Sequence, residues 1–166
     1  MQKIPVHNCG PGEYAAVVGI YNHYIEHSAA TFDMTPYSVG ERVPWFAQFA
    51  DTGPYQLLVA QVDGTVAGFC CSARFKPKPA YDVSVETTVY VAADALGRGI
   101  GDALYAELFE RLGTCGLHGA YAGITLPNDA SVRLHEKFGF RRIGVETEVG
   151  YKFDQYWSVA RFERRL

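Results

Sequence analysis

The chain has 166 residues, of which 48% are hydrophobic and 20% charged, and its formal net charge is −3. This length suits a single domain spanning residues 1–166, and the weak acidic balance gives no electrostatic reason to expect a nucleic-acid partner. No stretch approaches the roughly 18 apolar residues of a membrane span, and no long apolar run resembles a signal peptide. We therefore expect a soluble cytoplasmic protein without a membrane partner.

The N-terminal part predicts a short strand over residues 4–6, followed by a helix that opens at Pro11-Gly12-Glu13. A second helix is expected over residues 38–50. Phe32, in the segment between these helices, is a candidate wall of a substrate pocket, although simple loop packing explains it equally well. The apolar positions of the first helix follow a helical spacing: Val17, Ile20, Tyr21, Tyr24 and Ile25.

Metal and disulfide chemistry are not indicated by the histidines and cysteines. His23 and His27 lie four residues apart on the first predicted helix, but no third ligand is suggested nearby, so we expect no metal. The four cysteines have no Cys-x-x-Cys spacing. Cys70 and Cys71 would point to opposite faces of a strand, and we expect free thiols.

Two strands, 55–62 and 65–73, are joined by Asp63-Gly64, a strong hairpin signal. The following loop carries Lys76, Lys78 and Tyr81 and is stiffened by its prolines. Two lysines held close together could receive a carboxylate. The alternative is that they are solvated lysines in a linker.

Residues 83–91 predict the next strand, in which Val89 and Val91 alternate with other positions as in a half-buried strand. Glu86 is the one acidic residue in this apolar and threonine-rich run. Most strand carboxylates point to solvent, but one beside a ligand site could act as a general base. We favour the functional interpretation.

The central feature is a turn rich in glycine, Leu96-Gly97-Arg98-Gly99-Ile100-Gly101-Asp102, which leads into a helix ending near Gly113. Leu104, Leu108 and Leu112 recur every fourth residue along that helix. Glycines before a helix expose backbone N–H groups at the positive end of its dipole, where a phosphate can bind. The context fits neither a dinucleotide-binding turn, which follows a first strand, nor a P-loop, which needs Gly-Lys-Ser/Thr.

The C-terminal part predicts a strand over 118–125, a helix that starts near Asn128 and ends at Gly139, and closing strands over 140–148 and 157–164 around a loop at 150–153. On that helix, His135 lies four residues after Ser131, so the two share a face. His135 has a surface or interface role as its alternative. Together the elements predict an α+β fold whose ligand site lies where two central strands part.

The pattern from Leu96 to Gly101 resembles the pyrophosphate loop of the GNAT N-acetyltransferases, Gln/Arg-x-x-Gly-x-Gly/Ala, with Leu96 as a departure. Further segments resemble the phosphinothricin N-acetyltransferase group, which includes the methionine sulfoximine and methionine sulfone acetyltransferases. Nearly the whole chain is covered. The segments are Tyr21-Asn22-His23-Tyr24-Ile25, Ala80-Tyr81-Asp82, the strand from Val85 to Val91, the run from Leu126 to Glu136, and Gly150-Tyr151-Lys152.

This resemblance implies a GNAT-like sandwich with a mixed, mostly antiparallel sheet, splayed at the acetyl-CoA site and covered by helices on both faces. It implies acetyl-CoA as co-substrate, no metal, and a homodimer. Glu86 corresponds to the proposed base, and Asn128 or His135 could protonate the leaving thiolate. The coenzyme-binding residues would be Val89, Tyr90, Val91, Gly97, Arg98, Gly99, Ile100, Gly101, Asp102, Asn128 and Ser131. The acceptor-binding residues would be Phe32, Lys76, Lys78, Tyr81, Glu86, Thr87 and Thr88.

The expected reaction is direct acetyl transfer to the α-amino group of a small amino acid analogue, with the Val91 N–H stabilising the developing oxyanion. Lys78 departs from the arginine usual in the group, and Ser158 departs from an aspartate, so the acceptor is less well defined than the reaction. A GNAT enzyme for a peptide, polyamine or other amine is an alternative, against which Lys76 and Lys78 argue. A non-catalytic acyl-CoA-sensing module is another, and it would not need Glu86 and His135.

Overall fold

The computed structural model describes residues 3–166 of the chain. The order of strands and helices agrees with the one that the sequence predicts. In chain order they are β1 (Val6–Asn8), α1 (Tyr14–His27), α2 (Val39–Phe46), β2 (Leu57–Val62), β3 (Thr65–Arg74), β4 (Ser84–Val91), α3 (Ile100–Leu112), β5 (Gly119–Leu126), α4 (Asp129–Lys137), β6 (Arg141–Lys152) and β7 (Gln155–Arg165).

One continuous sheet runs through the fold in the order β1-β2-β3-β4-β5-β7-β6. Across residues 3–166, the β4–β5 pair is parallel and every other neighbouring pair is antiparallel. The predicted mixed, mostly antiparallel α+β sheet is therefore confirmed.

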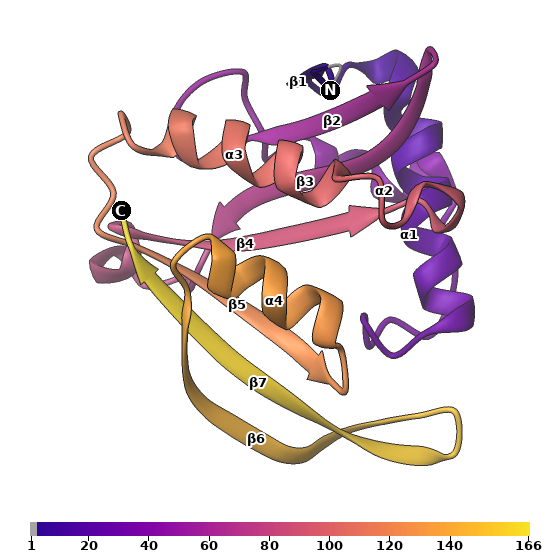
Figure 1. Ribbon diagram of the computed structural model, residues 1–166, viewed down its shortest axis with the longest axis vertical. Helices are drawn as coiled ribbons and strands as arrows, with labels where there is room; N and C mark the ends of the chain where they lie inside the picture. Colours follow the sequence, from indigo (N-terminus) through magenta and orange to yellow (C-terminus); the bar gives the residue numbers. More distant parts are fainter. Residues whose placement is uncertain (1–2) are drawn as a thin grey trace.

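Helices cover both faces of this sheet, as predicted (Figure 1). On one face, α3 packs on β2, β3 and β4 through Leu104, Leu108 and Leu112, which are fully buried. On the other face, α1 and α2 form a second hydrophobic cluster against β2 and β3. Cys70 belongs to the first cluster and Cys71 to the second, and both thiols are free.

The parallel ladder between β4 and β5 is short. It joins Ser84, Val85 and Glu86 to Gly119, Ala120 and Tyr121, and the described chain has no further pairing between these strands. Beyond Glu86 the two strands separate, so the splayed centre expected from the resemblance is confirmed. The backbone of β4 from Thr87 to Val91 consequently has no strand partner on its β5 side.

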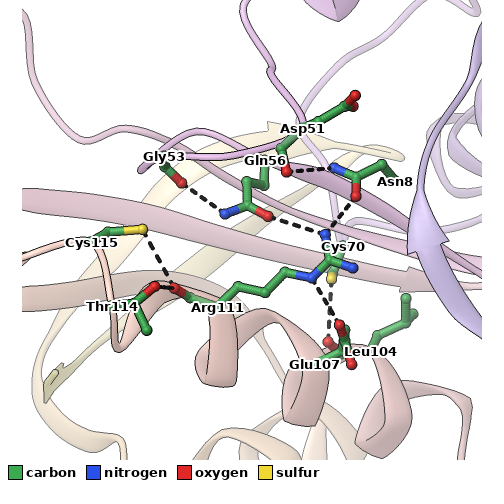
Figure 2. Close-up of polar contacts among 10 residues, drawn as sticks. All are labelled: Asn8, Asp51, Gly53, Gln56, Cys70, Leu104, Glu107, Arg111, Thr114 and Cys115. Carbon is green, nitrogen blue, oxygen red and sulfur yellow. Dashed lines mark hydrogen bonds and ion pairs between the residues drawn. The ribbon is translucent and has the colours of Figure 1, made fainter.

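Polar contacts connect the C-terminal end of α3 to the first part of the sheet (Figure 2). The Arg111 guanidinium pairs with Glu107 at 2.8 Å and donates to the side-chain oxygens of Asn8 and Gln56. Asn8 and Gln56 in turn donate to the carbonyls of Asp51 and Gly53. This network connects α3 to β1 and to the segment that precedes β2.

Several boundaries differ from the sequence prediction. The first strand is Val6–Asn8, and α2 ends at Phe46, soon after Pro44, whose ring removes a helical N–H. The predicted loop at 150–153 is wrong over 150–152, which pair with residues 155–157 in the β6–β7 ladder. The turn lies instead at Phe153 and Asp154, with φ of 53° and 56°. No Asn-Gly or Asp-Gly signal marks that turn, so the sequence pattern did not reveal it.

Two absences are observed within residues 3–166. No helix there combines the length and apolarity that crossing a bilayer requires. No group of three or more acidic, histidine or cysteine side chains in that range could hold a metal ion, and His23 and His27 are both exposed.

Candidate active site

A cavity of about 840 Å³ opens where β4 and β5 part. The C-terminal part of β4 contributes Glu86 to Val91, and α4 contributes Ser131, Leu134 and His135. The segment between α1 and α2 adds Thr31 and Phe32 at the opposite side. The topology therefore brings the predicted base, part of the predicted coenzyme site and several predicted acceptor residues into a single space.

Glu86 is the last β4 residue in the parallel ladder, so its side chain lies at the point where the strands begin to separate. It is half-buried and lines the cavity. Burial raises the pKa of this carboxyl above its ordinary value, and the positive charge of Arg161 acts in the opposite direction. A partly desolvated carboxylate in this position can accept a proton from a group bound in the cavity.

The backbone of β4 presents donors to the gap. The Ala92 N–H donates to the Ala67 carbonyl across β3, and N–H directions alternate along a strand. The N–H groups of Val89 and Val91 therefore face away from β3, toward the space that β5 leaves open. The N–H of Tyr90 instead faces β3. The ring of Tyr90 packs against those of Tyr21 and Tyr24. The Tyr24 hydroxyl donates to the Val91 carbonyl at 2.6 Å.

The glycine turn forms the N-terminus of α3, as predicted. Gly97 and Gly99 have φ of 74° and 78°, in the left-handed region that glycine tolerates best. Gly99 is the N-cap and supplies no side chain, so no side-chain cap occupies the first N–H groups of the helix. An anion can approach these groups directly.

Two other residues of this turn, Gly101 and Asp102, have contacts with α4 that the sequence did not indicate. A Cβ on Gly101 would lie 3.0 Å from the Leu134 side chain, so this glycine allows α3 and α4 to pack closely. Asp102 pairs with Lys137 of α4, and the Ile100 side chain is buried in the core. Arg98 is exposed. Of this loop, Leu96 lines the cavity, whereas Gly97 to Asp102 lie outside its lining.

On α4, Asn128 caps the helix by accepting from the Ser131 N–H at 3.1 Å, as predicted. His135 is only 3% exposed and both ring nitrogens have partners. Nδ1 lies 2.7 Å from the Ser131 carbonyl, which can only accept, so Nδ1 carries the proton. Nε2 lies 2.9 Å from the Tyr105 hydroxyl. Burial lowers the pKa of His135, so the ring is neutral at pH 7 and Nε2 accepts from Tyr105.

The cavity wall near Phe32 is held by the β6–β7 hairpin. The buried Lys152 ammonium donates to the carbonyls of Ser28 and Thr31, at 2.8 and 2.9 Å. The Phe32 ring lies directly on Gly150, where any Cβ would collide with it. These contacts position Phe32 and depend on residues more than a hundred positions later in the chain.

The predicted acceptor residues divide into two groups. Phe32, Glu86, Thr87 and Thr88 line the cavity, although the Thr87 hydroxyl is buried 3.5 Å from that of Tyr105. Lys76, Lys78 and Tyr81 do not line it. The Lys76 ammonium instead lies 5.0 Å from the ring centroids of Phe75 and Tyr81, and Phe75 stacks on Tyr121 beside Glu86.

Three charged residues of the cavity lining were missed by the sequence reasoning: Arg42, Glu146 and Arg161. Arg161 pairs with Glu146 at 2.9 Å and lies opposite Gly123, whose missing side chain leaves room for it. Arg42 shares a face of α2 with Trp45, three residues later. That spacing was the available signal for Arg42.

Comparison with known proteins identifies the family. A family model described as the acetyltransferase (GNAT) family matches residues 18–140. The chain belongs to the GNAT acetyltransferase family. It is 51% identical over 149 residues to a phosphinothricin N-acetyltransferase of Streptomyces coelicolor, covering 89% of this chain and 87% of that protein. It is 31% identical over 161 residues to an L-methionine sulfoximine/L-methionine sulfone acetyltransferase of Pseudomonas paraeruginosa, covering 97% and 94%.

The fold of this GNAT protein matches solved structures. A phosphinothricin acetyltransferase from Sinorhizobium meliloti, solved in complex with acetyl-CoA, superposes with a TM-score of 0.94 at 27% identity, covering 99% of this chain and 89% of that one. The protein is thus an acetyl-CoA-dependent N-acetyltransferase. The splayed strands, the exposed β4 donors and the uncapped N-terminus of α3 fit a long ligand with a thioester at one end and phosphates at the other.

Proposed function

We propose that this enzyme acetylates the α-amino group of a small amino acid analogue of the phosphinothricin, methionine sulfoximine or methionine sulfone type. The observation that carries the proposal is the place of Glu86, a half-buried carboxylate at the fork of β4 and β5 inside the cavity. The names of the similar proteins support the acceptor class.

Glu86 acts as the general base in this proposal. An α-ammonium group must lose a proton before its nitrogen can attack a thioester. A carboxyl whose pKa is raised by burial is a stronger base than a solvated one, and it accepts that proton directly or through a water. Arg161, whose charge lowers the pKa of Glu86, helps to keep the group ionised at neutral pH.

Acetyl-CoA supplies the activated acetyl group. The Val91 N–H, which faces the gap, would hydrogen-bond the carbonyl oxygen as its charge grows, and the N–H groups at the start of α3 would hold the pyrophosphate. Val89 would contact the pantetheine arm through its backbone. Asn128 and Ser131 line the same gap from the α4 side.

The role of His135 stays a prediction. Its neutral ring carries the proton on Nδ1, bonded to the Ser131 carbonyl, so Nε2 has none to donate. Protonating the departing thiolate would require the charged form, which burial disfavours. The geometry favours a positioning role, in which His135 orients Tyr105 and the first turn of α4. Four further points also stay predictions. They are acceptor binding by Lys76, Lys78 and Tyr81, a single domain over residues 1–166, a cytoplasmic location and a homodimer.

Glu86→Gln tests the proposed base. We expect kcat to fall roughly 100-fold or more, because the amide cannot accept the proton, while the Kd for acetyl-CoA changes little. The defect should shrink at high pH, where more acceptor arrives deprotonated. Glu110→Gln, the same change on an exposed α3 residue, is the matched control and should behave as wild type. A near-normal kcat for Glu86→Gln at neutral pH, with chemistry limiting the rate, would refute the base.

The acceptor class is tested by measuring thiol release from acetyl-CoA with amino acids, sulfoximines, sulfones, phosphinates, polyamines and peptides. We expect the highest kcat/KM for the amino acid analogues. A clear preference for polyamines or peptides would favour the alternative acceptors. Absence of turnover with every amine, together with tight acetyl-CoA binding, would favour an acyl-CoA-sensing module.

A further inference from the structure

Arg42 presents a half-buried guanidinium to the cavity from α2. Its Cζ lies 4.3 Å from the ring centroid of Trp45, 4.8 Å from that of Tyr37 and 4.9 Å from that of Tyr21. Ring faces attract a cation, but they provide no oxygen acceptor for the guanidinium N–H groups. The three rings therefore fix the position of the charge and leave its hydrogen-bonding capacity for another group.

Arg42 differs from the other arginine of the lining in having no ion-pair partner among the described residues. Arg161 is already paired with Glu146. Within residues 3–166 the structure has no ion pair that includes Arg42. The nearby Asp33 carboxylate accepts from the Tyr21 hydroxyl at 2.6 Å. A partly desolvated cation without an oxyanion partner is a site that an anionic ligand can complete.

Arg42 and Glu86 line the same cavity. Cys71 of β3 lines this cavity as well. Burial raises the pKa of its thiol, the charge of Glu86 raises it further, and the charge of Arg42 lowers it. The lining thus offers one negative and one positive group for which residues 3–166 provide no ion-pair partner. That arrangement matches a zwitterion, whose ammonium group would face Glu86 and whose acidic group would face Arg42.

We propose that Arg42 binds the acidic group of the acceptor and selects for acceptors that carry one. The acidic group is a carboxylate or phosphinate, and the planar guanidinium can donate to two of its oxygens at once. This proposal rests on the proposed function, since it names a specificity determinant of that reaction. It assigns charge recognition to α2 inside the cavity, whereas Lys76 and Lys78 lie outside the lining.

The test compares Arg42→Met with the double variant Lys76→Met/Lys78→Met on four acceptors. Methionine sulfone carries only a carboxylate, its carboxamide carries no acid, phosphinothricin carries both acids, and its decarboxylated analogue carries only the phosphinate. For Arg42→Met we expect KM to rise roughly 10- to 100-fold for acceptors bearing the recognised acid, the scale of a charge-assisted hydrogen-bonded pair. KM for the carboxamide should stay within about twofold, and kcat should change little.

Arg42→Lys guards against a folding defect, because it keeps the charge beside the rings but loses the two-pronged geometry. An intermediate KM at an unchanged melting temperature would support the proposal. Whether the loss follows the carboxylate or the phosphinate identifies which acid is bound. Equal KM increases for acidic and neutral acceptors would refute the proposal, as would a selective loss confined to the lysine double variant. If wild-type enzyme turned over none of the acid-bearing acceptors, the proposed acceptor class would itself fail.

Discussion

The two ends of α3 have opposite chemistry. At the C-terminal end, the Arg111 carbonyl accepts from the Thr114 hydroxyl and the Cys115 thiol, and the Arg111 side chain has three polar partners (Figure 2). At the N-terminal end, Gly99 provides no side-chain cap for the first N–H groups of the helix. The C-terminal end is thus hydrogen-bonded within the protein, whereas no side chain caps the first N–H groups of the N-terminal end.

This difference shows how one helix divides stability and function. Saturated polar groups stabilise the fold because leaving them unpaired in a partly buried place is costly. Unsaturated donors at the positive end of a helix stabilise a bound anion instead. Substitutions at the two ends should therefore separate into losses of coenzyme affinity and losses of folding stability.

The largest effect is expected at the N-terminal end of α3. Gly99→Val should weaken acetyl-CoA binding by roughly 100-fold, because a β-branched residue at positive φ is strained and its side chain would crowd a phosphate. Apart from its neighbours along the chain, no atom of residues 3–166 lies within 4 Å of the added Cβ, so the loss would not come from a collision with another part of the protein. Isothermal titration calorimetry with acetyl-CoA measures the effect.

Gly116→Val is the matched control for this change. Gly116 also has positive φ, 69°, and apart from its neighbours along the chain no described atom lies within 4 Å of an added Cβ. It lies, however, after the C-terminal end of α3. Both variants should lose stability by a similar amount, and only Gly99→Val should lose affinity for acetyl-CoA. Equal affinities in two folded variants would disprove the placement of the pyrophosphate.

The next largest effect is a loss of folding stability at the C-terminal end of α3. Arg111→Met should lower the free energy of unfolding by about 2 kcal/mol, because Asn8, Gln56 and Glu107 lose a charged donor while the apolar stem is retained. Urea denaturation measures this loss. Acetyl-CoA affinity should remain at the wild-type level, and a loss of affinity comparable to that of Gly99→Val would show that the two ends are not independent.

The smallest effect is a gain in stability at the cavity. Because burial raises the folded-state pKa of Glu86, its protonated form favours folding. That contribution is complete below the unfolded-state pKa, near 4.3, and is lost as pH rises through the folded-state pKa. Glu86→Gln should therefore have a slightly higher melting temperature than wild type at pH 7, and the difference should vanish near pH 4. A lower melting temperature at pH 7 would mean that the carboxylate stabilises the fold.

Short-range patterns determined much of this protein. The Asp63-Gly64 hairpin, the glycine turn, the Asn128 cap and the alternation of β4 depend on neighbouring residues, whose backbone preferences act locally. Glu86 could be singled out because a carboxylate is unusual within such a strand. These features were sufficient to predict the order of the elements and the α+β fold.

Only the tertiary structure decided which distant side chains share the cavity. The packing of α1 and α2 on the sheet brings Arg42 and Phe32 into the same cavity as Glu86, while Lys76 and Lys78 are close to Glu86 in sequence but outside the lining. Lys152 reaches the segment around Phe32 because β6 continues through residues 150–152, which the sequence analysis predicts as a loop. Such contacts join elements from opposite ends of the chain, and they depend on how whole faces pack, which local spacing does not encode.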